Sequence, residues 1–256
     1  MNTVISRLLV YAYNCYNRDI YYEMSLYILS NIAIIDDMTA SEFAKNCHTS
    51  LSTVKKFCKI LGYNDFNVMK QYLFSTMEIR RKQIEERYKS FNIDDLLNEI
   101  EIIGKEKIDK NQYLIAIESI VDEIYKADNV YIIAANYPLF LSFNFIEDFI
   151  IFNKSCFIQN VDLPLDDDFK KESTFSILIS ATGRYFMLNK IKSETILDVN
   201  SKIALISQNV SIKDKVGNLK AFINIPGKQD SESLNLIILN ILILIKFIYY
   251  QKYMIK

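Results

Sequence analysis

Apolar residues recur with two different periods along this chain. As far as about residue 126 they fall at intervals of three and four, as on one face of a helix. From Asn129 onward they form short continuous runs, most of them separated by further helical patterns. The change of period predicts an all-helical N-terminal part followed by a part that contains strands.

Helix signals are clearest between Thr39 and Gly62. Thr39 is followed three residues later by Glu42, the spacing of a capping box, which predicts a helix to about residue 47. Ser50 offers a second N-cap, and one apolar stripe follows it at Val54, Phe57, Cys58 and Leu61. Gly62 supplies the left-handed residue that is favoured at helix ends. We therefore expect two short helices joined by a tight turn.

Further helices are expected around this pair. Their predicted ranges are 3–16, 18–31, 65–88, 94–103 and 111–126. Ile28, Leu29 and Ile32 are expected to supply part of a small helical core. The charged run from Glu78 to Lys82 is most simply a solvated helix face, with contact to phosphate by Arg80 and Arg81 as the alternative.

Five short apolar runs predict strands. They lie at 130–134, 155–158, 175–180, 202–207 and 221–225. Because they are apolar on both faces and rich in β-branched residues, they are typical of a parallel sheet covered by helices. Right-handed crossovers make such a sheet doubly wound, and ligands then bind at the carboxyl ends of the strands, near a switch in strand order. The expected fold class is α plus α/β.

Charge is distributed unevenly, although the net charge of the chain is only −1. Residues 39–82 hold six lysines and two arginines against three acids, a net charge of +5, whereas residues 91–130 hold ten acids against four lysines, a net charge of −6. A basic segment joined to an acidic one fits a nucleic-acid-binding domain attached to a domain that does not bind nucleic acid.

The outer face of the predicted helix after Ser50 carries hydroxyls and lysines and no acid. This composition indicates a helix-turn-helix whose second helix enters the major groove of DNA, with a solvated amphipathic pair as the alternative. Short hydroxyls suit base edges and phosphates, and lysines neutralise the flanking backbone. The candidate DNA contacts are Thr39, Ser41, Lys45, Ser50, Ser52, Thr53, Lys55, Lys56 and Lys59.

The stretch from Ser50 to Tyr63, with Asp65-Phe66 and Met69-Lys70 after it, resembles the N-terminal domain of RpiR/MurR-type bacterial transcription regulators. Lys56 keeps the charge of the family's usual basic residue before Phe57 but gives up the bidentate fork of an arginine. The resemblance implies a helix-turn-helix domain at 1–77, linker helices at 78–110 and a sugar isomerase (SIS) domain at 111–256. It also implies a regulator of sugar or amino-sugar metabolism genes that binds double-stranded operator DNA.

The segment Ser180-Ala181-Thr182-Gly183-Arg184 follows the third predicted strand and leads into a predicted helix. Amides at a helix start, two hydroxyls and a guanidinium can hold a phosphate, although Ser and Thr are also ordinary N-caps. The turn resembles the phosphosugar-binding loop of SIS domains at Ser180, Thr182 and Gly183, but Tyr185 replaces the final Thr. Ser207 and Ser211 stand where that family carries a Thr and a Ser. The candidate effector contacts are Asn136, Ser180, Thr182, Gly183, Arg184 and Ser207.

The loop after the first strand departs from the family pattern. SIS domains usually show Gly-x-Gly-x-Ser there, and this chain has Ala134-Ala135-Asn136-Tyr137-Pro138. Without the glycines a close approach of the backbone to a phosphate is harder, although Asn136 can still donate a hydrogen bond. The expected effector is a small anionic metabolite such as a sugar phosphate; the alternative is a domain that only dimerises.

Other sites are not indicated. The four cysteines have no Cys-x-x-Cys spacing and His48 is the single histidine, so neither a metal nor a cofactor is expected and the thiols fit a reducing cytoplasm. The chain is not expected to be an enzyme. A phosphosugar isomerase is the rival interpretation, with Glu232 as the one acid considered for a general base.

The segment from Leu234 to Tyr253 is the most apolar in the chain. Its length almost allows a membrane span, but Asn235, Asn240 and Lys246 are costly in hydrocarbon. The N-terminal apolar run is interrupted by polar residues and makes a poor signal peptide. We therefore expect a cytoplasmic homodimer or higher homo-oligomer with no membrane partner, in which this last helix is buried in protein.

Overall fold

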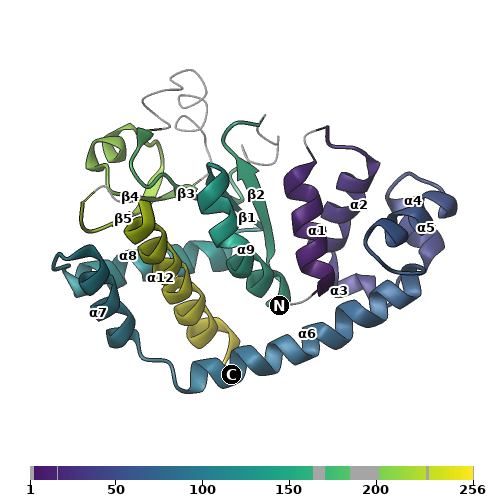
Figure 1. Ribbon diagram of the computed structural model, residues 1–256, viewed down its shortest axis with the longest axis horizontal. Helices are drawn as coiled ribbons and strands as arrows, with labels where there is room; N and C mark the ends of the chain where they lie inside the picture. The colour runs from purple at the N-terminus through teal and green to yellow at the C-terminus, as the bar shows by residue number, and fades with distance from the viewer. Residues whose placement is uncertain (1–2, 16, 164–170, 185–201, 229–230, 256) are drawn as a thin grey trace. The chain divides into compact units, whose positions relative to one another are not determined.

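The computed structural model describes residues 3–15, 17–163, 171–184, 202–228 and 231–255 (Figure 1). By contacts the chain divides into two compact units: the first is Met1–Ser90 with Ile146–Ser155, and the second is Phe91–Phe145 with Cys156–Lys256. Helices alone form the N-terminal part, and a five-stranded sheet with helices forms the rest, which confirms the predicted fold class. The division into DNA-binding, linker and effector domains stays a prediction.

The first unit contains six helices in the described N-terminal part of the chain. They are α1 (Thr3–Asn14), α2 (Ile20–Ser30), α3 (Ile32–Ile35), α4 (Ala40–Asn46), α5 (Leu51–Ile60) and α6 (Phe66–Lys89). Five of them lie within a few residues of their predicted ranges, because α2, α4, α5 and α6 each begin at a side-chain cap that is readable locally. The short α3 was not predicted.

Aromatic rings and aliphatic side chains fill the core of this unit. Phe43 of α4 stacks on Phe66 of α6 with ring centroids 4.7 Å apart, and Tyr21 of α2 stacks on Phe57 of α5 at 5.9 Å. The predicted core residues are buried, namely Ile28, Leu29, Ile32, Val54, Phe57, Cys58 and Leu61. Burial raises the pKa of the Cys58 thiol to about 12, so this cysteine acts as a small apolar residue.

Helix α6 carries one charge in its buried stripe. The buried positions recur at intervals of three and four, at Phe66, Met69, Leu73, Met77, Arg80, Ile84 and Tyr88. Arg80 is only 4% exposed, and its Nε and Nη2 donate to Oδ1 of Asp148 at 3.0 and 2.7 Å. Asp148 lies in the part of α9 (Asn136–Ile151) that belongs to the first unit. The predicted solvated face is therefore wrong for Arg80, whereas Arg81 is exposed and pairs with Glu78.

The second unit is built on the sheet. Its strands are β1 (Asn129–Ala134), β2 (Ser155–Asn160), β3 (Thr174–Ile179), β4 (Lys202–Ser207) and β5 (Leu219–Asn224), in the order β2-β1-β3-β4-β5. The pairs β1–β3, β3–β4 and β4–β5 are parallel, as predicted. In this doubly wound order the connections change direction between β1 and β3, which makes the carboxyl ends of these two strands the expected ligand site.

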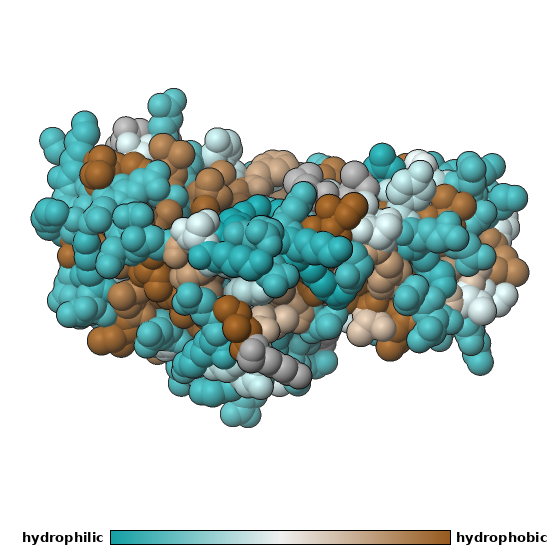
Figure 2. All heavy atoms as spheres, turned by 90° about the horizontal axis from the view of Figure 1, so that it is seen from below, coloured by the Kyte–Doolittle hydropathy of each residue, from teal (hydrophilic) through white to brown (hydrophobic). Residues whose placement is uncertain are grey.

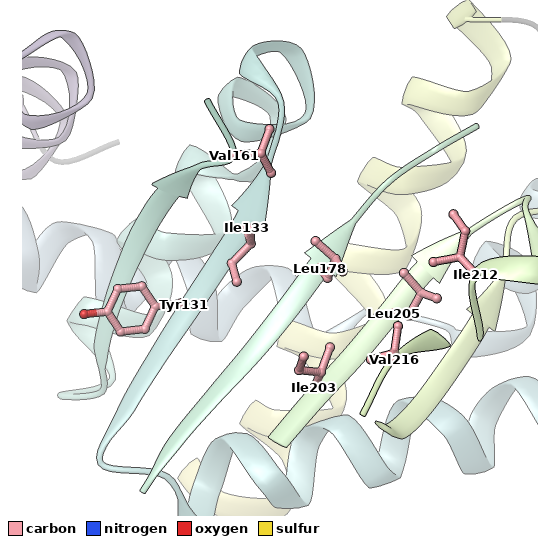
Figure 3. Close-up of a cluster of buried hydrophobic side chains, with 8 residues drawn as sticks. All are labelled: Tyr131, Ile133, Val161, Leu178, Ile203, Leu205, Ile212 and Val216. Carbon is pink, nitrogen blue, oxygen red and sulfur yellow. The ribbon is translucent and has the colours of Figure 1, made fainter. Parts of the chain in front are cut away.

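Both faces of the sheet are covered. One face carries the buried cluster of Figure 3, which joins β1, β3, β4 and the residue after β2 to the 3-10 helix η2 (Val210–Lys215) and the residue after it. Its members are Tyr131, Ile133, Val161, Leu178, Ile203, Leu205, Ile212 and Val216. The alternate strand positions, such as Ile132, Ile177 and Ile206, are also buried. This two-sided burial explains why the strands read as continuous apolar runs.

Three further helices of the described chain belong to the second unit, besides η2 and the first part of α9. They are α7 (Ile93–Gly104), α8 (Lys110–Lys126) and α12 (Ser231–Tyr249), and α12 packs against the other two before ending in the π-helical turn η3 (Tyr250–Met254). By length and composition alone the segment Glu232–Met254 is able to cross a membrane, yet 67% of its most apolar window is buried inside the protein. Lys246 within it is 2% exposed and donates to Oδ1 of Asn144 at 2.6 Å. The segment therefore has the burial expected of a core helix.

Candidate nucleic-acid interface and effector loop

A short, well-tied turn joins α4 to α5. Thr39 and Glu42 form the predicted capping box at the start of α4. In the turn itself His48 adopts a left-handed conformation (φ +51°), and the Thr49 amide donates to the Ala44 carbonyl at 2.8 Å. The Ser50 hydroxyl then accepts from the Thr53 amide at 3.2 Å and starts α5. The two predicted helices and their tight connection are confirmed.

Gly62 ends α5 as predicted, with φ +85°. A side chain there would also collide with Arg7 of α1, since a Cβ atom would lie 2.7 Å from its Nη1. That guanidinium group donates to the Leu61 carbonyl and lies 5.2 Å from the centre of the Tyr63 ring. The C-terminus of α5 is therefore held by α1, whereas Leu51 and Ser52 in its first turn are exposed.

The outer face of α5 is basic and solvent-exposed. Ser52, Lys55, Lys56 and Lys59 are exposed, and none of these lysines makes an ion pair within the described part of the chain. Thr53 is half-buried, with its hydroxyl 3.0 Å from that of Ser50. With no acid among them, the exposed groups create a local excess of positive charge on one side of a helix of ten residues.

The remaining DNA-contact candidates lie on and before α4. Ser41 and Lys45 are exposed. Thr39 is also exposed, but its hydroxyl donates to Oε2 of Glu42 at 2.7 Å and accepts from the Glu42 backbone amide. The hydroxyl is therefore used in capping α4. Lys70 of α6, a basic residue of the resembling stretch, donates instead to the carbonyls of Asp36 and Met38 at 2.6 and 2.8 Å.

A small cavity lies at the carboxyl ends of β1 and β3, where the strand order switches. It encloses about 200 Å³ and is lined by Ala135 and Pro138 after β1, by Val161 after β2, and by Leu178, Ile179, Ser180, Ala181, Thr182 and Arg184 at the end of β3. Ser180, Thr182 and Arg184 are neighbours in one loop, and the order of the strands places Ala135 and Pro138 beside them. Asn136 adjoins the cavity in sequence, and its Oδ1 accepts from Asn160.

Gly183 is required by the path of this loop. Its φ is +73°, and an added Cβ atom would lie 2.5 Å from Ile212 and 2.6 Å from the side-chain amide of Asn209. Glycine is the only residue without such a Cβ, so it allows the loop to approach the residues that follow β4. The conformation is completed by a hydrogen bond from the Gly183 amide to the Ser180 carbonyl at 3.2 Å.

Ser207, the last residue of β4, holds the loop that contains Ser180 by a hydrogen bond. It is fully buried, its hydroxyl donates to the Ser180 carbonyl at 2.6 Å, and it accepts from the Asn209 amide at 3.0 Å. The hydroxyl is therefore engaged by the protein itself, so the geometry gives Ser207 a positioning role beside the cavity. Arg184 is exposed, and its Nε donates to the Thr182 hydroxyl at 3.1 Å. Tyr185 and the helix predicted after this loop fall outside the described residues.

One polar residue at this edge of the sheet was missed by the sequence analysis. Gln208 follows β4. Its backbone amide donates to the Ala181 carbonyl at 2.8 Å, and its side-chain Nε2 donates to the Gly227 carbonyl at 2.9 Å. Its Oε1 is buried and has no hydrogen-bond partner among the described residues. The signal that was available is its place directly after a predicted strand, where ligand contacts concentrate in doubly wound sheets.

Cys47, His48 and Glu232 have side chains with metal-binding or acid–base chemistry. Within the described ranges no group of three or more His, Cys, Asp or Glu side chains is placed to hold a metal ion. Burial raises the pKa of the Cys47 thiol to about 11, so it is protonated at neutral pH. His48 lies in the α4–α5 turn of the first unit, and Glu232 lies in the first turn of α12 in the second.

No family model and no curated protein sequence matches the chain. Among solved structures, the Vibrio vulnificus NanR protein complexed with ManNAc-6P is 13% identical, with 96% of this chain and 92% of that chain covered and a TM-score of 0.44. A hypothetical protein of Methanococcus jannaschii, inferred to be a 3-hexulose-6-phosphate isomerase, is 17% identical over 63% of this chain and 91% of its own, with a TM-score of 0.47. A further hypothetical protein is 14% identical over 71% and 92%, with a TM-score of 0.45. Likeness at this level carries no argument about function.

Proposed function

We propose that this chain is a sequence-specific DNA-binding transcription regulator of sugar or amino-sugar metabolism genes, acting in the cytoplasm. The observation that carries the proposal is the outer face of α5, where Lys55, Lys56 and Lys59 are exposed and make no ion pair with any described residue, and where the helix itself holds no acid. Lysines of this kind neutralise phosphates and release condensed counterions from duplex DNA. A solvated face of a purely structural helix has no need to exclude acids.

The dimensions of α5 suit the major groove. Its ten residues span about 15 Å, and the groove is about 12 Å wide and admits one helix. In the proposed complex the N-terminal turn with Ser50 and Ser52 meets base edges and phosphates. Lys56 and Lys59 lie farther along the same face and contact the flanking backbone or guanine. Lys56 acts there as a point charge and not as a bidentate fork.

The proposal includes a homodimer. Two copies of α5 separated by about one turn of DNA, roughly 34 Å, read a two-fold operator, because each copy then meets the same groove face. The α/β unit is proposed to hold the two copies together. A dimer also doubles the number of phosphate contacts and so steepens the dependence of affinity on salt.

The cavity at the switch point is the proposed effector site. It combines the hydroxyls of Ser180 and Thr182 with the guanidinium group of Arg184, a donor set that suits a phosphate or another small anion. At about 200 Å³ it lies below the ~300–1,000 Å³ of most ligand sites, a volume suited to the phosphate end of a sugar phosphate. An anion that favours one arrangement of the dimer changes DNA affinity, and DNA changes anion affinity by the same factor.

Selection of bound duplexes from a random DNA pool tests the DNA-binding proposal directly. We expect recovery of a two-fold sequence, and fluorescence anisotropy should show that it binds at least 10³ times more tightly than random duplex. Affinity should fall steeply between 50 and 200 mM salt. Equal affinity for every duplex, or no binding at low salt, would remove the proposal.

Thermal unfolding in the presence of anions tests the effector site. Glucosamine 6-phosphate, fructose 6-phosphate and inorganic phosphate should be compared, because a ligand that binds only the folded state raises the melting temperature. The shift should disappear in Arg184→Ala and persist in the matched control Arg87→Ala, an exposed arginine of α6. If none of the anions shifts the wild-type protein, the alternative of an α/β unit that only dimerises is favoured.

A further inference from the structure

Leu51 is the first residue of α5 and lies between Ser50 and Ser52. Its side chain is 54% exposed. An exposed leucine alone is ordinary, as the scattered hydrophobic side chains on the face shown in Figure 2 illustrate. What sets Leu51 apart is its place, because the N-terminal turn of the second helix is the part of a helix-turn-helix that meets base edges.

Helix geometry places Leu51 at the border of the basic face. Residues three and four apart are neighbours on a helix surface, so Leu51 adjoins both Val54 and Lys55. Val54 is buried and Lys55 is exposed. The leucine therefore stands between the core stripe and the lysines, and the fold leaves it in solvent where a polar residue would serve as well.

The chemistry of this face restricts what it can read. The exposed or half-buried side chains of α5 are hydroxyls, lysines and aliphatic groups, with no carboxylate to accept from cytosine and no amide to pair with adenine. Lysine suits guanine. Among the base edges of the major groove, only thymine offers a methyl group to an apolar side chain.

We propose that Leu51 determines specificity by packing on the C5 methyl group of a thymine in each half-site, next to a base read by Ser52 and Lys56. The inference rests on the proposed function, since it needs α5 in the major groove. It adds an apolar contact to an interface that otherwise consists of charges and hydroxyls. The operator should therefore hold a required thymine at the position nearest the start of α5.

Replacing single thymines of the selected duplex with 2′-deoxyuridine tests this contact, because the change removes only the methyl group. Wild-type affinity should fall about fourfold when one half-site is substituted, because burying one methyl-sized group strengthens binding by about that factor. When both half-sites are substituted, affinity should fall by the square of that factor. Leu51→Ala should bind the thymine duplex more weakly and lose its sensitivity at that one position. Ile60→Ala, which truncates a side chain that is 53% exposed at the other end of α5, should keep it.

A second variant changes the base that is read. Leu51→Gln keeps a good helix former and adds the amide that pairs with adenine, so duplex selection with this variant should replace the required thymine with adenine. Equal affinity of the wild-type protein for thymine and deoxyuridine duplexes would overturn the inference, as would unchanged sensitivity in Leu51→Ala. Failure to select any duplex with the wild-type protein would instead overturn the proposed function, and this inference with it.

Discussion

Two charged runs in the helical unit look alike in the sequence and differ in the structure. The first is the set Lys55, Lys56 and Lys59 on α5, and the second is the run Glu78–Lys82 on α6. All three lysines of the first run are exposed. In the second, Arg80 is buried against Asp148 while its neighbour Arg81 remains in solvent.

Helix phase explains the difference. The buried stripe of α5 passes through Val54, Phe57 and Cys58, and no lysine falls on it. The stripe of α6 reaches Met77 and resumes at Ile84, and Arg80 occupies the step between them. Composition predicts that both runs are exposed, but the register of the apolar residues decides which charge turns inward.

The two kinds of charge also carry different energetic consequences. A buried ion pair has lost the hydration of both partners, so removing one partner leaves the other uncompensated and destabilises the fold strongly. Replacing both partners with apolar residues is often neutral or stabilising, so the pair is no proof of extra stability. Exposed lysines contribute little to folding and remain available to a partner.

The largest expected effect comes from breaking the buried pair. Arg80→Met should lower the free energy of unfolding by about 3–5 kcal/mol, because it removes the guanidinium charge that is paired with the buried Asp148 carboxylate. The double variant Arg80→Met/Asp148→Leu should recover most of that loss. Urea denaturation of both variants measures the difference.

The matched control for this prediction is Arg81→Met, because the Arg81 side chain is 43% exposed and, among the described residues, its ion pair is with the neighbouring Glu78. It should change the free energy of unfolding by less than about 1 kcal/mol. Equal losses of stability in Arg80→Met and Arg81→Met would show that the two arginines have the same environment in solution. That result would contradict the burial of Arg80.

The exposed run should show the opposite pattern, with an effect on DNA and not on folding. Lys56→Ala and Lys59→Ala should each weaken operator binding and reduce the slope of log K against log salt by about 0.9 per lost phosphate contact, and by twice that in a homodimer. Fluorescence anisotropy over a salt series gives the slope. Urea unfolding should be nearly unchanged.

Lys82→Ala provides the control, since Lys82 is exposed and belongs to the charged run of α6. It should leave affinity and salt slope close to wild type. If both α5 variants bind the operator as tightly as the wild-type protein, these lysines do not belong to the interface.

A smaller effect is expected from the cap that starts α5. Ser50→Ala removes the hydroxyl that accepts from the Thr53 amide at 3.2 Å and should cost about 1 kcal/mol of stability. Ser52→Ala is the comparison, because Ser52 is exposed on the same turn and should change stability by no more than about 0.5 kcal/mol. Urea denaturation that ranks the two variants in the reverse order would count against the assigned cap.

The smallest expected effect is a change in the pH dependence of stability at acid pH, caused by one surface carboxyl group. Hydrogen bonds from the Thr39 amide and hydroxyl lower the pKa of Glu42, so its contribution to stability is present above its ordinary pKa of about 4.5 and is lost as pH falls through the lowered value. Glu42→Gln should therefore make the melting temperature less sensitive to pH below about 4.5. Parallel melting curves for both proteins between pH 3 and 6 would contradict this.

The sequence by itself was sufficient for features that depend on a few neighbouring residues. The starts of α4, α5 and α6 lie where Thr39, Ser50 and Asp65 cap them, since each cap bonds an amide three residues away. The five strands match their predicted apolar runs to within two residues at each end, because burial on both faces leaves a local signature. The exposed lysines of α5 follow from the phase of its apolar stripe.

The candidate effector loop was identified only in part. Its position after β3 was readable from the sequence, but its neighbours were not. The order of strands places Ala135 and Pro138 beside it and turns the Ser207 hydroxyl to the Ser180 carbonyl. Gly183 is needed because Asn209 and Ile212 approach it after another strand.

Only the tertiary structure decided the environment of Arg80. Its position in the stripe of α6 was visible in the spacing from Met77 to Ile84, but a buried arginine needs a partner, and Asp148 lies 68 residues away along the chain. Local signals arise from hydrogen bonds and packing within one or two helical turns, whereas pairing over such a separation depends on how whole elements assemble. The sequence therefore determined the helices, the strands and the basic face of α5, and the fold alone decided which partner a buried charge has and which loops share a cavity.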